Sequence, residues 1–189
     1  MPPPSASMQA TAAAAAQRAA VLQSAQQRNF DMIAGGEPLR GLLSHLATTA
    51  EALADSATVA SILVLDGDGL LRNGASPNLP ADYLDRIDRL KPDARVGTCA
   101  AAAATGEIVL TPSFYDDQRW AELRHLPLAL GFLGAWSMPI KNAQGRVLGT
   151  FGTYFREHRE PTAEEREAVR VLAACAARAI EARANAVAA

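Results

Sequence analysis

The stretch GAWSMPI, residues 134–140, has the length and pattern of a β-strand and lies between an apolar helical run and a glycine-rich segment. Side chains alternate between the two faces of an extended strand. One face carries small side chains, those of Ala135, Ser137 and Pro139. The other face carries mostly large ones, with Gly134, Trp136, Met138 and Ile140. We expect the small face to border a cavity and the large face to pack against the terminal helices. A strand hydroxyl such as that of Ser137 can equally bond to neighbouring backbone.

Further strands are predicted on either side of this one. The segment RVLGTFGTYF (146–155) follows after a turn at 142–145, so the two should form a hairpin. Upstream, EIVLT (107–111) reads as a short strand, and VASILVLD (59–66) returns through the turn DGDG into LLRNGA (70–75). Hairpins and short loops favour an antiparallel sheet. The predicted class is α+β, with helices on both faces of a central sheet.

Long helices are predicted at both ends of the chain. Residues 1–34 are interpreted as a disordered start (1–7) and an N-terminal helix (about 8–33), and residues 35–187 as the folded domain. The last helix should begin with a capping box of Thr162 and Glu165. A narrow seam repeats along it: Val169, Leu172, Ala176, Ala179 and Arg183. Because such a seam is typical of coiled coils, we predict a parallel-like homodimer through the helices that flank the domain.

Shorter helices are expected between the strands. One should occupy residues 80–90. The segment VGTCAAAAATG (96–106) predicts a helix with Thr98 as its N-cap and Gly106 at its end. The segment QRWAELRHLPLALG (118–131) predicts a helix that Pro127 interrupts.

Composition argues against several functional classes. The chain has 18 basic and 20 acidic residues, a net charge of −2 and no basic cluster, so nucleic acid is not an expected partner. It contains neither an apolar run long enough to span a membrane nor a secretory leader, so we expect a cytoplasmic protein. Cys99, Cys175 and three isolated histidines form no metal-site spacing, and no cofactor is expected. The DGDG turn lacks the later glycine and glutamate of a calcium loop.

From about residue 54 to residue 182 the chain resembles the bacterial GAF sensory domains, especially the group associated with histidine kinases and cyclic-di-GMP enzymes. The matching segments occur in the family's order and with its separations: ASILVLD, NGASPNLPADY, VGTCAAAAATGEIV, DQRWAEL, GAWSMPI, GRVLGTFGTYFRE and RAIEAR. The resemblance implies a GAF-like antiparallel sheet with long N- and C-terminal helices. It also implies a small-molecule pocket between the sheet and a crossover segment at residues 95–124.

Six residues are candidates for ligand binding at that position: Thr98, Cys99, Ala100, Tyr115, Trp120 and Ser137. The helix start at residue 98 offers unpaired backbone N–H groups to an anion or a carbonyl, with Tyr115 and Trp120 above it. Cys99 is interpreted as a small buried residue rather than a redox site. The family usually has glycine and threonine where this chain has Ala100 and Ala101, so we expect a pocket with few polar groups.

The favoured function is a sensory module, not an enzyme. It would bind an unknown small molecule and signal through its terminal helices to a histidine kinase or a cyclic-di-GMP enzyme acting in trans. The alternatives are a structural dimerisation unit with a filled pocket, a GAF-fold reductase of free methionine sulfoxide, and a module for a large cofactor. Such a reductase needs several cysteines around its pocket. Bilin-binding GAF domains have histidine where alanine follows Cys99 here.

Overall fold

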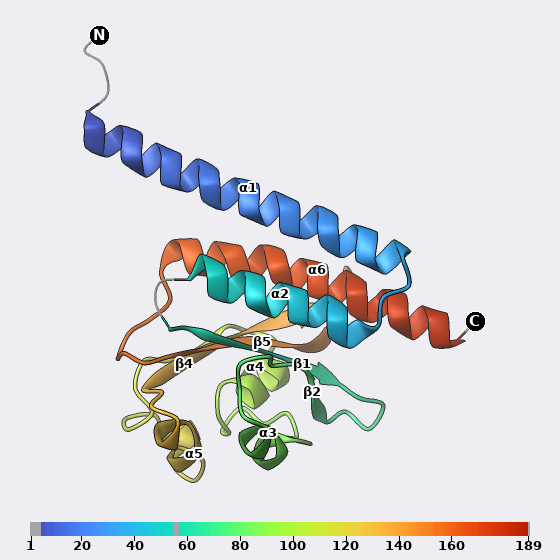
Figure 1. Cartoon of the computed structure of the whole chain (residues 1–189). Helices are drawn as coiled ribbons and strands as arrows, with labels where there is room; N and C mark the ends of the chain where they lie inside the picture. The colour runs from blue at the N-terminus through green and yellow to red at the C-terminus, as the bar shows by residue number, and fades with distance from the viewer. Residues whose placement is uncertain (1–4, 55–56, 189) are drawn as a thin grey trace.

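Five strands form one antiparallel sheet in the order β2-β1-β5-β4-β3 (Figure 1). Their bounds are β1 Val59–Leu65, β2 Leu71–Ala75, β3 Val109–Thr111, β4 Gly134–Lys141 and β5 Val147–Phe155. The computed structural model describes residues 5–54 and 57–188. The strand predicted for GAWSMPI is β4, and it pairs with β5 along its whole length, with Ser137 opposite Gly152. The α+β class and this hairpin are therefore confirmed.

Helices cover both faces of the sheet, as predicted (Figure 1). On one side, called here the helix face, lie α1 (Ala6–Ala34), α2 (Leu39–Leu53) and α6 (Ala163–Ala188). On the other side, called here the crossover face, lie α3 (Ala81–Ile87), α4 (Cys99–Thr105), α5 (His125–Ala129) and the 3₁₀ turn η1 (Gln118–Trp120). None of the described helices is both long and apolar enough to cross a membrane.

The alternation predicted for β4 is confirmed. Trp136, Met138 and Ile140 belong to the core between the sheet and the helix face, together with leucines of α2 and Leu172 of α6. Ser137 points the other way, because its Oγ lies 3.0 Å from the Sγ of Cys99 on α4. Large apolar side chains thus stabilise one face of the strand, and a small one lets α4 approach the other closely.

The capping box at the start of α6 is also confirmed. The backbone N–H of Glu165 donates to the Thr162 hydroxyl at 3.1 Å, and the N–H of Thr162 donates to the Glu165 carboxylate at 2.8 Å. These two bonds satisfy donors that a helix start otherwise leaves unpaired. The same carboxylate accepts two bonds from the Arg159 guanidinium, at 2.7 and 2.8 Å.

The coiled-coil interpretation of the α6 seam is wrong. Val169, Leu172, Ala176 and Ala179 are at most 3% exposed and pack inside the domain's own core. Arg183 donates to the backbone oxygens of residues 33 and 37, next to the end of α1. The small alanines let α6 lie close to the sheet and to α1 and α2, so the spacing reflects intramolecular packing.

Three local predictions need correction. Thr98 makes no side-chain cap bond, because it has helical dihedral angles (φ −89°, ψ −46°) instead of the extended ones that an N-cap requires. Pro127 does not interrupt a helix, since it lies in the first turn of the separate helix α5, where proline is tolerated. Of the start predicted to be disordered, residues 6 and 7 are helical after the N-cap Ser5, and residues 1–4 lie outside the described part.

Candidate functional site

A cavity of about 20 Å³ lies on the crossover face, between the sheet and residues 95–124. We call it the crossover cavity. Its lining comes from β1, β5, α4 and the segments around them: Leu63, Ile87, Leu90, Val96, Gly97, Thr98, Cys99, Ala100, Trp120, Leu123 and Tyr154. The residue types are mostly apolar, and none carries a formal charge at neutral pH. The volume is close to that of one or two buried waters.

Hydrogen bonds connect the roof of the crossover cavity, which consists of Gly97 and Trp120, to the neighbouring segments. The N–H of Gly97 donates to the backbone oxygen of Arg119 at 2.8 Å. The Arg119 guanidinium pairs with Asp117 at 2.7 Å and donates to the backbone oxygen of Leu110, in β3, at 2.8 Å. Gly97 has a φ of +53°, and a Cβ there would lie 3.6 Å from the Trp120 ring. Glycine thus allows the turn that places this indole over the cavity.

Cys99 and Ala100 form the floor, and further small residues lie behind them where α4 meets β4 and β5. The α4 alanines 100–103 are buried, and Cys99 is 8% exposed. A Cβ on Gly152 would lie 3.2 Å from the Cys99 sulfur, so glycine makes this close approach possible. Burial raises the pKa of the Cys99 thiol. Cys99 is therefore a neutral thiol and a weak nucleophile at physiological pH.

Tyr154 lines one side of the cavity and is paired with Tyr83 behind it. The Tyr83 hydroxyl donates to that of Tyr154 at 2.9 Å, and the two rings meet edge to face. Burial raises the pKa of both phenols. Both hydroxyls therefore stay protonated, and Tyr154 brings a neutral group to the cavity wall.

Trp120, which lines the same cavity, has a donor without a partner among the described residues. Its ring packs against Phe114 with 4.6 Å between centroids, and the residue is 4% exposed. The indole Nε1 has no hydrogen-bond partner among the described residues. An unpaired buried N–H costs about 1–3 kcal/mol, so a bound molecule with a hydrogen-bond acceptor would gain from meeting it.

The structure brings four of the six candidate residues to the cavity: Thr98, Cys99, Ala100 and Trp120. Ser137 lies one contact behind the lining, bonded to Cys99. Tyr115 lies elsewhere, 55% exposed, with its ring 6.2 Å from that of His158. Tyr154 and Leu123 were missed. Tyr154 could have been found, because it lies two residues beyond Gly152 on one face of a predicted strand.

Metal-binding clusters are not found in the part of the chain that the structure describes, where no three His, Cys, Asp or Glu side chains could hold an ion together. Cys99 and Cys175 are both buried and unpaired. They belong to different cores, Cys99 on the crossover face and Cys175 on the helix face.

Comparison with known proteins gives a consistent family. The family model described as "GAF domain" matches residues 36–181. A relative from Methanosarcina acetivorans, the methyl sulfide methyltransferase-associated sensor, is 33% identical over 158 residues. That match covers 83% of this chain and 16% of the relative, so the chain spans about a sixth of the relative's length.

Two solved structures illustrate the range of proteins with this fold. A domain of a sensor histidine kinase from Sinorhizobium meliloti aligns with a TM-score of 0.63 at 19% identity, over 77% of this chain and 92% of that one. Free methionine-R-sulfoxide reductase from Neisseria meningitidis, solved with its substrate, aligns with a TM-score of 0.69 at 16% identity, over 91% and 93%. At these identities the likeness concerns the fold alone.

Proposed function

Because the chain belongs to the GAF domain family, we propose that it is a sensory module that binds a small neutral molecule in the crossover cavity. The observation that carries this proposal is the enclosed, apolar cavity with one unpaired donor, Trp120 Nε1. The sensor relative supports a sensory role.

The lining defines the chemistry of the ligand. No charged side chain lies among the lining residues, so a charged ligand would lose its hydration without compensation. A volume of about 20 Å³ limits the ligand to a few non-hydrogen atoms. The relative's name connects it with methyl sulfide methyltransferase, and methyl sulfides are neutral and small. Dimethyl sulfide and dimethyl sulfoxide are therefore suitable probes, the second with the stronger hydrogen-bond acceptor.

Mass spectrometry of small molecules released from the denatured protein tests this proposal. We expect a neutral compound from the wild type and none from Leu123→Phe, which narrows the cavity. The matched control is Leu128→Phe, a partly buried leucine of the same apolar cluster that does not line the cavity. If nothing is released and neither probe binds, the pocket is filled by side chains and the chain is a structural GAF unit.

We propose that no chemical turnover takes place at this site. The Cys99 thiol is held neutral by burial, and Cys175 lies in the core on the opposite side of the sheet. A reductase that forms a disulfide would need a second cysteine within reach of the first. An assay with free methionine-R-sulfoxide should give no reduction. Activity in the wild type that disappears in Cys99→Ala would show that the chain is an enzyme.

The signal would leave through the terminal helices. Strands β4 and β5 carry Ser137 and Gly152 toward α4 and carry Trp136 and Phe151 toward the terminal helices. A change in the crossover cavity thus reaches α6 through two strands. We propose a histidine kinase or a cyclic-di-GMP enzyme as the receiver.

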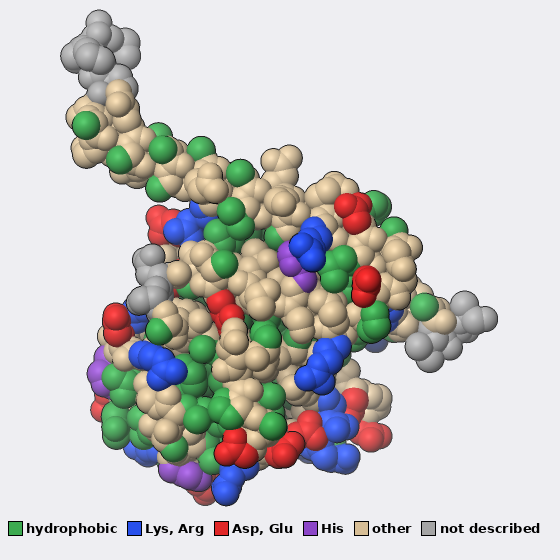
Figure 2. Space-filling model, in the orientation of Figure 1, with side chains coloured by type: hydrophobic (Ala, Val, Ile, Leu, Met, Phe, Trp, Pro, Cys, Tyr) green, Lys and Arg blue, Asp and Glu red, His purple; other side chains and the backbone are tan. Residues whose placement is uncertain are grey.

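We also propose a homodimer, built on α1 instead of the α6 seam. We take residues 35–187 as the sensory domain and residues 1–34 as a separate N-terminal segment whose helix α1 pairs. Residues 5–17 of α1 are exposed and stand clear of the body of the domain (Figure 2). Light scattering should show a dimer for the full chain and a monomer after deletion of residues 1–17. The deletion keeps the α1 residues that contact α2 and α6, so a monomeric full chain would contradict the proposal.

A further inference from the structure

A second cavity lies on the helix face, on the opposite side of the sheet from the crossover cavity. We call it the helix-face cavity. It has a volume of about 10 Å³ and lies where α2 ends and α6 begins: Ala50, Leu53, Ala54, Thr58, Trp136, Thr153, Glu165, Ala168 and Val169. This volume is at the lower limit of the space that one buried water requires.

Two polar atoms in its lining have no hydrogen-bond partner among the described residues. They are the indole Nε1 of Trp136 and the hydroxyl Oγ1 of Thr153. Trp136 is 1% exposed and Thr153 is 4% exposed, so bulk water does not satisfy them. The two residues face each other across β4 and β5 in the sheet register. Leaving such a pair unsatisfied is costly, and native interiors rarely do so.

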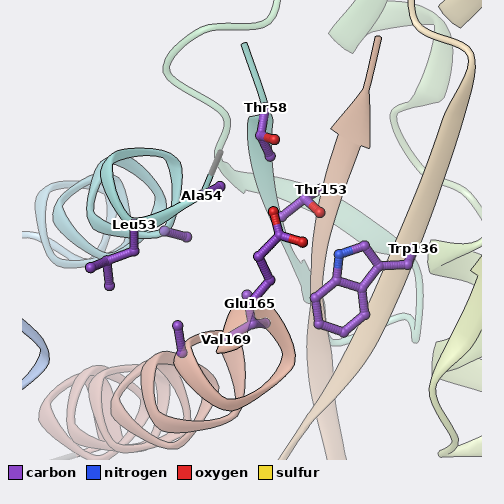
Figure 3. Close-up of a pocket in the computed structure, with 9 residues that line it drawn as sticks. Leu53, Ala54, Thr58, Trp136, Thr153, Glu165 and Val169 are labelled. Carbon is purple, nitrogen blue, oxygen red and sulfur yellow. The ribbon is translucent and has the colours of Figure 1, made fainter. Parts of the chain in front are cut away.

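The third polar group of the cavity is the Glu165 carboxylate. Its side chain is 7% exposed and is already held by Arg159 and by the N–H of Thr162. Figure 3 shows the indole nitrogen of Trp136, the Thr153 hydroxyl and the Glu165 carboxylate all directed toward one small space between α6 and the sheet. The space therefore has one obligatory donor, one obligatory acceptor and one hydroxyl that can be either.

We propose that the helix-face cavity is a hydration site for one structural water. That water accepts the Trp136 N–H, donates to the Glu165 carboxylate and shares a hydrogen bond with the Thr153 hydroxyl. Three partners of this mixture are what a buried water typically has. A larger ligand does not fit the volume, and an apolar atom would leave the Trp136 N–H and the Thr153 hydroxyl unsatisfied.

The water joins the sheet to the first turn of α6. Glu165 closes the capping box of α6 and also holds Arg159, whose guanidinium lies 3.7 Å from the centroid of the Phe155 ring. Trp136 is adjacent in β4 to Ser137, which contacts Cys99 on the other face. The hydration site thus connects the strand behind the crossover cavity to the helix that leaves the domain.

NMR of the ¹⁵N-labelled full chain tests the site directly. The two tryptophan indole signals are assigned with Trp120→Phe. We expect the Trp136 Hε1 proton to show a nuclear Overhauser cross-peak to a long-lived bound water, with slow exchange of the proton itself. No cross-peak in the wild type would overturn the proposal and would indicate a direct Trp136–Glu165 bond or a dry cavity.

Two isosteric variants on β5 supply the matched comparison. Thr153→Val removes one polar partner of the water, and the cross-peak should fall to the noise. Thr150→Val makes the same change three residues away, at a buried threonine that does not line this cavity, and the cross-peak should persist. Equal loss in both variants, or persistence in both, would contradict the assignment of Thr153 to the water. Neither result depends on whether the crossover cavity binds a ligand.

Discussion

The two faces of the β4–β5 hairpin are packed on different principles. On the helix face, large residues such as Trp136 and Phe151 fill the space against α2 and α6. On the crossover face, Ser137 and Gly152 let α4 come close, and the nearby cavity is lined by Tyr154 of β5, Leu63 of β1, the start of α4 and the segments around them. The helix face therefore carries most of the fold's stability. The crossover face is packed less closely and contains the crossover cavity, which we propose as the ligand site.

The largest expected effect is a difference between the two tryptophans. Trp136→Ala should lower the free energy of unfolding by about 3–5 kcal/mol, because it removes the largest side chain of a closed core. Trp120→Ala should cost less, since its neighbour Leu123 is only partly buried and the crossover segment can close over the space. Urea unfolding of both variants measures the difference. An equal or larger loss for Trp120→Ala would invert the comparison.

Substitutions at two glycines of β5, Gly149 and Gly152, extend the comparison of close contacts in the hairpin. A Cβ on Gly149 would meet the backbone oxygen of Leu63 in β1, which cannot move away without breaking the sheet. We expect Gly149→Ala to cost about 3 kcal/mol. A Cβ on Gly152 would come tightly against the ends of the Ser137 and Cys99 side chains, at 3.0 and 3.2 Å, and lie at an ordinary 3.5 Å from the backbone oxygen of Trp136, so Gly152→Ala should cost about 1 kcal/mol. Thermal unfolding should rank the two variants in this order.

A smaller effect is expected at the Cys99 thiol. Cys99→Ala should cost no more than about 1–2 kcal/mol at neutral pH, as for a small buried group. The pKa of Cys99 is raised in the folded chain above its ordinary value of 9.0, so the unfolded chain ionises first as the pH rises. Stability from this thiol is thus complete below pH 9 and is lost progressively as the pH rises above it.

The variant Cys99→Ala is also the control for the pH dependence of stability. Cys175 and the two buried tyrosines also have raised pKa values, and Cys99→Ala leaves them in place. The wild type should therefore lose more stability than Cys99→Ala between pH 8 and pH 10. Parallel curves for the two proteins would show that the folded thiol ionises as easily as the unfolded one.

The sequence predicted best where a local pattern determines the outcome. Alternation in GAWSMPI placed Trp136 and Ser137 on their correct faces, and the Thr162–Glu165 spacing located the start of α6. Prediction from the sequence failed where tertiary packing determines the structure. The α6 seam is buried by the domain itself, and Thr98 takes helical dihedral angles within a buried segment.

Four of the six candidate residues line one cavity, and their role in ligand binding stays a prediction. The resemblance to GAF domains placed Thr98, Cys99, Ala100 and Trp120 in one region, but it could not show that Tyr115 would lie exposed beside His158. Unpaired donors such as the indole nitrogens of Trp120 and Trp136 depend on the positions of all their neighbours. No sequence pattern predicts such donors, because the lack of a hydrogen-bond partner depends on how the whole core packs.

The two indole signals also give the most direct test of ligand binding at the crossover cavity. In ¹H–¹⁵N spectra recorded during titration with dimethyl sulfoxide and, separately, with dimethyl sulfide, the Trp120 indole signal should shift until it saturates. The Trp136 signal should stay near its starting position, and Leu123→Phe should abolish the Trp120 shift while Leu128→Phe preserves it. A Trp120 signal that neither probe moves, or that moves equally in the Leu123→Phe variant, would contradict the proposed sensory pocket.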